Sequence, residues 1–260
     1  LNGLAQDDLG LVMYRPDDPA DPSDLRLKIF SQRAPMTLSQ VMPHLSSLGV
    51  QIVDEHPHRI ILRGQEVWLF DLGLQTPGEP WKEAGRRRFT EAFAASWKGE
   101  CESDTFSGLV TEAGLSWPQV AMLRCIARYL RQVGSPFSQT YMARALRANP
   151  HLARDLVGMV EAKFDPTAFD DGDDAGPQRL AKVEELSQGF LADLEDVASL
   201  DHDRILRTMH AVIKAMIRTN WWQSDRRALA FKIRPADLDF APLSYTHLTL
   251  TTMRIVYISV

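Results

Sequence analysis

The chain has 260 residues, 45% of them hydrophobic, so it can bury an apolar core but exceeds the commonest size of a single domain. Its formal net charge of -5 argues against a nucleic-acid partner, since binding a polyanion depends on a surplus of Lys and Arg. The two cysteines lack C-x-x-C spacing, and no apolar stretch approaches the roughly 20 residues that cross a bilayer. We therefore expect a cytoplasmic protein of two or three packed units with no nucleic-acid or membrane partner.

The first residues predict no regular structure. Position 1 is Leu instead of Met, which suggests that the sequence is a piece of a longer protein. Between Arg15 and Asp24 three prolines alternate with aspartates, a composition that cannot hold a helix or a central strand. We assign residues 1–24 to the end of a preceding domain and a linker.

Residues 25–76 predict a small α+β module. Apolar and polar residues alternate at 25–30, which indicates a half-buried strand, and apolar residues at 37–48 have the spacing of one helical face. Gly49 is expected to end this helix. Further strands are predicted at 50–54, 59–62 and 66–72. This order indicates a sandwich in which helices cover one face of an antiparallel sheet.

The pattern becomes helical from residue 77, and we assign 77–223 to a mostly α-helical domain. Helices are predicted at 81–97, 102–113, 116–134, 138–148 and 149–164. Two more follow a loop at 165–176 that is rich in Asp and Gly, and the second is expected to be capped by Asp201 and to reach Ile217. Residues 224–243, with a strand at 228–233, begin a strand region.

The last residues are treated separately. Ser244–Leu250 resembles the translated read-through of a sequencing-library adapter. We therefore expect 244–260 to be a non-native tail and exclude it from fold reasoning. The alternative is a native β-strand, because Tyr, Thr, Ile and Val are plentiful there.

Glycine spacing bears on nucleotide binding. No glycine is followed two positions later by another, so the sequence lacks the G-x-G-x-x-G fingerprint of dinucleotide-binding folds. Gly73 and Gly78 have the spacing of a phosphate loop, but Glu79 and Pro80 stand where Lys and Ser or Thr are required. The sequence therefore predicts neither a dinucleotide fingerprint for nicotinamide nor a phosphate loop.

Two groups of residues raise the question of a metal. His56 and His58 lie two apart in strand-like sequence and could chelate a metal with a neighbouring carboxylate, as in an independent metal-dependent enzyme. We favour an ordinary strand and turn around Pro57, because a zinc site needs a third placed ligand. The aspartates at 170–174 could suggest calcium, but Gly172 falls too early for an EF-hand loop, and a solvated loop is favoured.

Aromatic residues gather in the helical region. Tyr129, Phe137 and Tyr141, with Trp221 and Trp222, could form a ligand cage. We favour packing within or between domains, because aromatics at the ends of amphipathic helices more often pack.

The most specific pattern is carried by six segments, which are Ala127–Gln132, Phe137–Tyr141, Glu161–Pro166, Val197–Leu206, Arg218–Gln223 and Ala228–Pro235. They resemble the large multidomain NAD-specific glutamate dehydrogenases of bacteria, in the part just upstream of the catalytic domain. Residues 25–74 resemble the ACT-like module that precedes these helices in the family. The resemblance runs in one linear order from about Leu4 to Pro242, which is more specific than any single motif.

The resemblance implies an internal, non-catalytic segment with a scaffolding and regulatory role. The parent would oxidise L-glutamate to 2-oxoglutarate and ammonia with NAD, and its catalytic lysine and nucleotide fold would lie farther toward the C-terminus. This chain would supply no catalytic, cofactor-binding or metal-binding residue. Its partners would be the catalytic domain of the same polypeptide, further copies in a homo-oligomer, and an amino-acid effector. The alternative is a free-standing ACT-like ligand-binding protein with a helical adaptor region.

If the module binds an effector, the candidate site is the turn Arg33, Ala34, Pro35 and Met36, between the first strand and the first helix of the module. In ACT-like modules this turn often borders an effector pocket. A helix N-terminus offers N–H groups to a carboxylate, and Arg33 would add a charge-assisted partner. A plain connecting loop with a surface arginine is the favoured alternative, because helix N-termini that bind nothing are ordinary.

Overall fold

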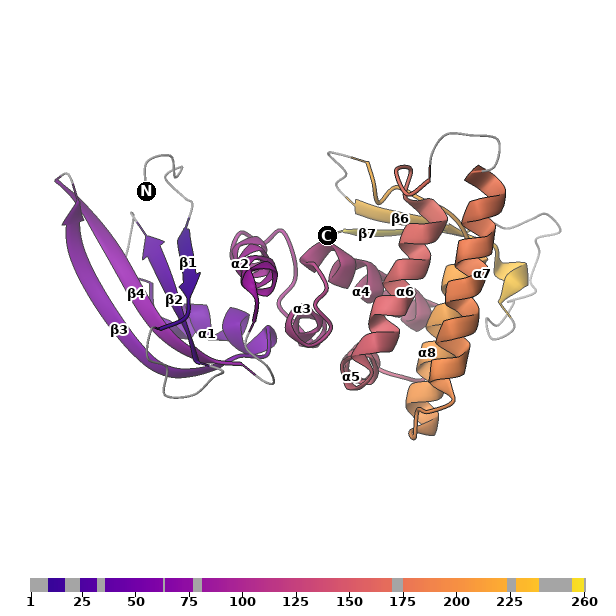
Figure 1. The fold of residues 1–260 in the computed structure, drawn as a ribbon, viewed down its shortest axis with the longest axis horizontal. Coiled ribbons are helices and arrows are strands. Elements are labelled where there is room, and N and C mark those ends of the chain that lie inside the picture. The colour runs from indigo at the N-terminus through magenta and orange to yellow at the C-terminus, as the bar shows by residue number, and fades with distance from the viewer. Residues whose placement is uncertain are drawn as a thin grey trace. The chain divides into compact units, whose positions relative to one another are not determined.

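The computed structural model describes residues 9–16, 24–31, 36–62, 64–76, 81–169, 175–223, 228–238 and 254–259. The chain divides into two compact units, Leu1–Trp117 and Pro118–Val260. The first contains an antiparallel sheet with helices, and the second is mainly helical (Figure 1). The predicted α+β fold, with a small sheet module followed by helices, is confirmed.

A four-stranded sheet is the centre of the first unit. Its strands follow the order β1-β2-β4-β3, with all neighbours antiparallel. They are β1 (Gly10–Tyr14), β2 (Asp24–Ser31), β3 (Gln51–Leu62) and β4 (Gln65–Gln75). Residues 10–14 pair with 26–30, so the sheet reaches into the range 1–24, which was predicted to be the end of a preceding domain and a linker. The strand was missed because it has only five residues and the proline-rich stretch follows it at once.

The second half of the sheet also differs from the prediction. The strands expected at 50–54 and 59–62 form one strand of 12 residues, β3, which contains Pro57. β3 is at the edge of the sheet, where a proline is tolerated within a strand. The prediction of two strands was wrong because it treated this proline as a break.

Two helices complete the core of the first unit. The helix α1 (Leu38–Ser47) begins after Thr37, and Gly49 has a φ of 83°, as expected of a glycine that ends a helix. The helix α2 (Glu83–Trp97) contacts β1 and α1. Leu25, Leu27 and Ile29 of β2 are at most 2% exposed, which buries one face of the sheet. The short helices η1 (Thr105–Gly108) and α3 (Leu109–Glu112) close this unit.

The second unit is built from amphipathic helices. They are α4 (Trp117–Gln132), α5 (Gln139–Ala148), α6 (Pro150–Phe164), α7 (Ala175–Leu194) and α8 (Leu200–Ala215). Asn149 and Pro150 open α6 as predicted. The cap of α8 is Ser199, whose side chain accepts from the N–H of His202, so the prediction of Asp201 as the cap was two residues late.

A second antiparallel sheet follows α8. Its order is β5-β6-β7, with β5 at Met216–Thr219, β6 at Ala228–Ile233 and β7 at Arg254–Ser259. A short helix, η2 (Pro235–Asp237), follows β6. The helix predicted to reach Ile217 therefore ends at Ala215. The strand β7 lies in the tail excluded above and pairs with β6, and the non-native origin of 244–260 stays a prediction.

Candidate functional site

The turn predicted to bind an effector is only partly described. Arg33, Ala34 and Pro35 lie outside the described residues, and Met36 is 7% exposed and belongs to the core. The N-terminus of α1 follows directly. The N–H of Thr37 donates to Oε1 of Gln40 over 2.9 Å, and the N–H of Gln40 donates to the Thr37 carbonyl over 3.0 Å.

These contacts limit what the start of α1 can offer a ligand. The N–H groups of Thr37 and Gln40 are already bonded, which leaves Leu38 and Ser39 as first-turn residues whose N–H groups have no partner inside the helix. Two such groups match the two oxygens of one carboxylate.

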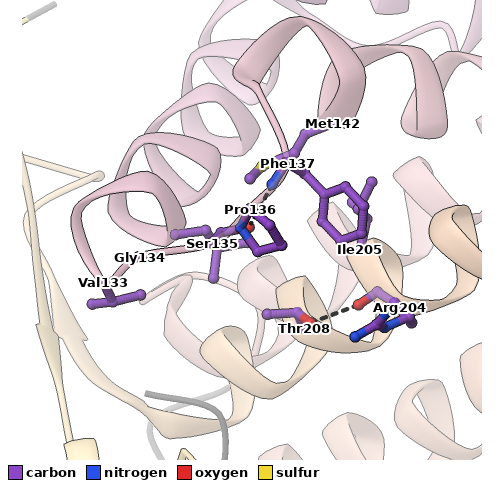
Figure 2. Close-up of a pocket in the computed structure, with 10 residues that line it drawn as sticks. Val133, Gly134, Ser135, Pro136, Phe137, Met142, Arg204, Ile205 and Thr208 are labelled. Carbon is purple, nitrogen blue, oxygen red and sulfur yellow. Dashed lines mark hydrogen bonds between the residues drawn. The ribbon is translucent and has the colours of Figure 1, made fainter. Parts of the chain in front are cut away.

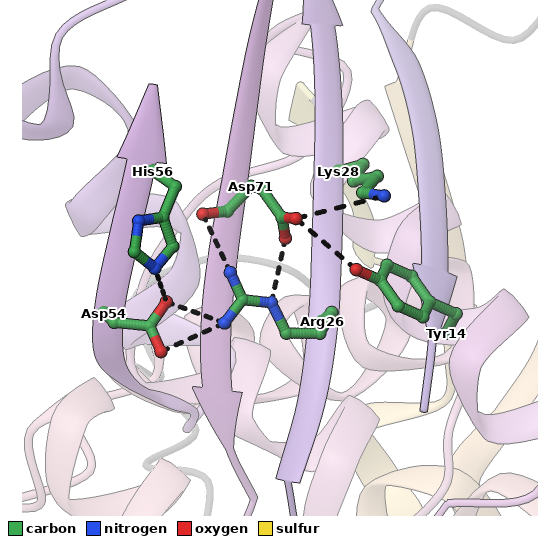
Figure 3. A network of polar contacts seen from close by, with 6 residues as sticks. All are labelled: Tyr14, Arg26, Lys28, Asp54, His56 and Asp71. Atoms are coloured by element: carbon green, nitrogen blue, oxygen red, sulfur yellow. Dashed lines mark hydrogen bonds and ion pairs between the residues drawn. The ribbon is translucent and has the colours of Figure 1, made fainter. Parts of the chain in front are cut away.

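The polar face of the first sheet carries a network of six side chains (Figure 3). At its centre is the guanidinium group of Arg26 on β2. Its Nε donates to Asp71 on β4 over 2.9 Å, and its Nη1 lies 2.7 and 3.0 Å from the two carboxylate oxygens of Asp54 on β3. Tyr14 and Lys28 reach the other Asp71 oxygen at 3.4 and 3.9 Å.

Gly73 makes this arrangement possible. It pairs with Arg26 on one side and with Asp54 on the other, so the two partners are separated by the whole of β4. A Cβ at position 73 would lie 2.5 Å from Oδ2 of Asp54 and 2.9 Å from Cγ2 of Val53. Because position 73 has no side chain, the Asp54 side chain can extend across β4 and reach Arg26.

The same contacts bear on the metal hypothesis. Nε2 of His56 lies 3.4 Å from Oδ1 of Asp54, so the predicted neighbour is present. However, Arg26 already contacts both oxygens of Asp54 and places a positive charge where a metal ion would sit. Across the part of the chain that the structure describes, no three His, Cys, Asp or Glu side chains are grouped to hold a metal. We therefore interpret the network as a tie between strands.

The second unit buries a histidine, His210, that no motif in the sequence indicates. His210 on α8 is 7% exposed, its Nε2 lies 2.8 Å from Oγ of Ser187 on α7, and its ring stacks on Phe190 with centroids 5.1 Å apart. Burial, with a smaller contribution from the Lys214 ammonium group, lowers the pKa of His210 to about 4. The ring is therefore neutral at pH 7 and packs in the core.

A cluster of cations lies around a cavity of about 330 Å³ at the ends of α6 and α8. The side chains are Lys163, Arg179, Lys214 and Arg234. Burial, and then repulsion from Lys214, lowers the pKa of Lys163 to about 8.

Each of these cations has a protein partner. The ammonium group of Lys163 donates to the carbonyls of Ile213 and Lys214 at the end of α8, and Arg179 donates to the carbonyls of Ala162 and Asp165 at the end of α6. Lys214 pairs with Glu184, and Arg234 pairs with Asp237. Two of the cations therefore bind helix ends and two form ion pairs, so we do not consider the cluster an anion site.

The aromatic cage does not form as one site. Tyr129 is 1% exposed in the core, while Trp221 and Trp222 pack on each other with centroids 5.7 Å apart. Phe137 and Tyr141 are brought together, with stacked rings 5.8 Å apart. Tyr129 and the two tryptophans are therefore packing residues, as the favoured interpretation held.

Comparisons with known proteins match the chain along its length. Residues 8–87 match the ACT3 domain of glutamate dehydrogenase, residues 101–166 match its helical motif 3, and residues 189–253 match the catalytic domain of bacterial NAD-glutamate dehydrogenase. Most of the chain therefore matches a segment of the bacterial NAD-specific glutamate dehydrogenases. The three matches follow the order that the resemblance implied.

Relatives named NAD-specific glutamate dehydrogenase support the same conclusion. The protein of Halomonas elongata is 35% identical over 241 residues, which are 90% of this chain and 14% of the relative. That of Mycobacterium tuberculosis is 35% identical over 221 residues, 80% of this chain and 13% of the relative. That of Pseudomonas aeruginosa is 34% identical over 234 residues, 84% of this chain and 14% of the relative. The chain thus spans about a seventh of the relatives that it matches.

The boundaries of the matched ranges differ from those predicted for the domains. The catalytic-domain match begins at residue 189, in α7, and so lies partly inside the range 77–223 that was assigned to a helical domain. It also extends into the range 244–260. Within the described residues, no helix combines the length and apolar character needed to cross a bilayer.

Proposed function

We propose that this chain is a non-catalytic scaffolding and regulatory segment of a cytoplasmic NAD-specific glutamate dehydrogenase. The parent enzyme would oxidise L-glutamate to 2-oxoglutarate and ammonia, with NAD as hydride acceptor. The observation that carries the proposal is the succession of an ACT3 match, a helical-motif match and a catalytic-domain match of 189–253 in one chain. The catalytic domain of the same polypeptide and further copies of the enzyme would be its partners.

The absence of catalysis within the chain is inferred from chemistry. The sequence has no G-x-G-x-x-G fingerprint, and residues 216–233 pair as antiparallel strands, whereas a dinucleotide-binding fold begins with parallel strands joined by a helix. The polar groups described above are also engaged. Arg26 ties strands, and Lys163 binds the end of a helix. Residues 189–253 would then support the active site of the parent without reaching its substrates.

The experiment is a comparison of the isolated chain with the complete parent enzyme. Calorimetric titration with NAD and a spectrophotometric assay of glutamate oxidation should both give no signal for the chain and clear signals for the parent. Saturable binding of NAD to the chain, with a Kd in the micromolar range, would show that the cofactor site lies inside these residues.

The regulatory part of the proposal rests on the start of α1. An amino-acid effector would place its carboxylate against the N–H groups of Leu38 and Ser39, with Arg33 as its charged partner. L-amino acids would be titrated against the chain while its melting temperature is measured. Arg33→Ala should weaken binding about tenfold, which corresponds to about 1.4 kcal/mol. If Arg33→Ala changes the affinity by less than about threefold, Arg33 is not part of the binding site.

A further inference from the structure

A separate cavity lies in the helical unit, where the end of α4 approaches α8 (Figure 2). Its volume is about 170 Å³. Four apolar side chains line it, and each is at most 8% exposed, namely Leu130, Val133, Met142 and Ile205. Pro136 and the ring of Phe137 add to the lining. An apolar cavity of roughly 150 Å³ accepts a molecule the size of benzene, so this one has room for about six carbon atoms.

The wall at 134–137 is held in place by contacts outside the cavity. Nη1 of Arg131 donates to the carbonyls of Ser135 and Phe137. The N–H of Phe137 donates to Oγ of Ser135, and the Phe137 ring stacks on Tyr141 at an interplanar angle of 29°. Because these contacts fix the turn before any ligand arrives, binding would cost little ordering of the loop.

The lining includes one cation, Arg204. The side chain of Arg204 on α8 is exposed and makes no hydrogen bond or ion pair with any residue that the structure describes; only its carbonyl is engaged, by Oγ1 of Thr208 over 2.6 Å. The nearby acids are engaged elsewhere. Asp203 binds Arg207 at 2.8 Å, and Asp201 accepts from the hydroxyl of Tyr141 at 3.4 Å.

We propose that this cavity binds a small organic carboxylate whose apolar group, aryl or branched alkyl, fills the space between α4 and α8 while its carboxylate pairs with Arg204. A guanidinium group offers parallel N–H donors that fit the two oxygens of a carboxylate. The apolar lining accounts for the other half of such a ligand. The cavity belongs to the second unit, so the ligand is distinct from the effector proposed for the turn at 33–36.

Phenylacetate is the probe, and phenylacetamide is its neutral counterpart of the same shape. Each is titrated into the 260-residue chain, with binding followed by amide chemical shifts in two-dimensional NMR. We expect phenylacetate to bind with a Kd of about 1 mM or tighter, to shift the amides of 133–137 and 204–208, and to bind about tenfold more tightly than phenylacetamide. Absence of saturation by about 10 mM, or equal affinity for the two compounds, would overturn the proposal.

Three variants locate the site. Arg204→Gln replaces an exposed side chain and should weaken phenylacetate about tenfold, with no change for phenylacetamide. Thr208→Phe places a ring in the cavity and should abolish binding of both compounds. Arg144→Gln is the matched control, because Arg144 is an exposed arginine on α5 that does not line the cavity, and its affinity should stay that of the unmodified chain. Equal weakening by Arg204→Gln and Arg144→Gln would indicate only nonspecific attraction and would reject the site.

Discussion

Arg26 on β2 binds the carboxylate of Asp54 on β3 although β4 lies between the two strands. The contact spans the sheet at Gly73, where a side chain would occupy the space that the Asp54 carboxylate fills. Nε of the same guanidinium group holds Asp71 of β4, so one side chain links three strands. The exposure of Asp54, 43%, keeps the expected contribution of its ion pair modest.

Gly73→Ala should lower the free energy of unfolding of the first unit by about 1–2 kcal/mol, because the new Cβ displaces Asp54 from Arg26. Chemical denaturation gives the value. The control is Gly73→Ala introduced into the Asp54→Ala variant, which lacks the carboxylate that the new Cβ would meet. The cost should then be smaller, and an equal cost in both backgrounds would show that Asp54 is not what the new methyl group meets.

Gly158→Ala should raise the stability of the second unit by about 0.5–1 kcal/mol, because Gly158 lies inside α6 and no atom of a described residue comes within 4 Å of the place of its Cβ. Gly134→Ala provides the contrast. The space beside Gly134 is equally open, but its φ of 90° is strained for alanine, so this variant should lose about 1 kcal/mol. Thermal melts of the two variants test whether the backbone conformation of the glycine decides if alanine raises or lowers the stability.

His210 predicts a dependence of stability on pH. Its pKa of about 4 in the folded chain lies below the ordinary value of 6.5, so the unfolded chain binds more protons between these two values. Stability should therefore be fully present above pH 6.5 and should fall as the pH drops toward 4, by up to about 3 kcal/mol from this group. Urea denaturation at intervals across the window measures the slope.

The variant His210→Gln isolates this contribution. It should be less stable than the unmodified chain at pH 7, because it loses the stacking on Phe190, yet its stability should change less between pH 6.5 and 4. Parallel curves for the chain and His210→Gln would exclude His210 as the source.

Lys163 should be an unusually reactive amine. With a pKa of about 8, roughly half of its side chains are neutral at pH 8, and the neutral amine is the form that attacks an acylating reagent. Trace labelling with acetic anhydride, measured by mass spectrometry, should therefore modify Lys163 in the folded chain to a greater extent than expected for a lysine with the ordinary pKa of 10.5. Lys214→Gln removes a neighbouring positive charge and should raise the pKa and reduce the labelling. Unchanged labelling in Lys214→Gln would exclude repulsion as a cause.

Features set by neighbouring residues were predictable from the sequence, and those set by distant ones were not. The helix that Gly49 ends and the opening of α6 at Asn149 and Pro150 depend on local backbone preferences, which the sequence displays directly. The continuity of β3 through Pro57 depends on a place at the sheet edge, which periodicity does not reveal.

The sites show the same division. The strand that contains Arg26 was predicted from its alternating pattern. That Asp54 is the partner of Arg26 could not be predicted, because it depends on the register of β2, β4 and β3. The cavity beside Arg204 is formed by segments about seventy residues apart along the chain, so no local sequence motif predicts it. Arg33 was selected by analogy with ACT-like modules, and its role stays a prediction.

The cations of α6 and α7 each close the end of another helix, Lys163 that of α8 and Arg179 that of α6. An opening of α7 would remove the donors on which the last turn of α6 depends, and an opening of α6 would do the same to α8. The three helices should therefore lose their amide protection against hydrogen exchange together, as one cooperative folding unit, with the terminal turns exchanging no faster than the helix centres. In an isolated helix the last turn frays first; here the ends are tied into the cooperative unit.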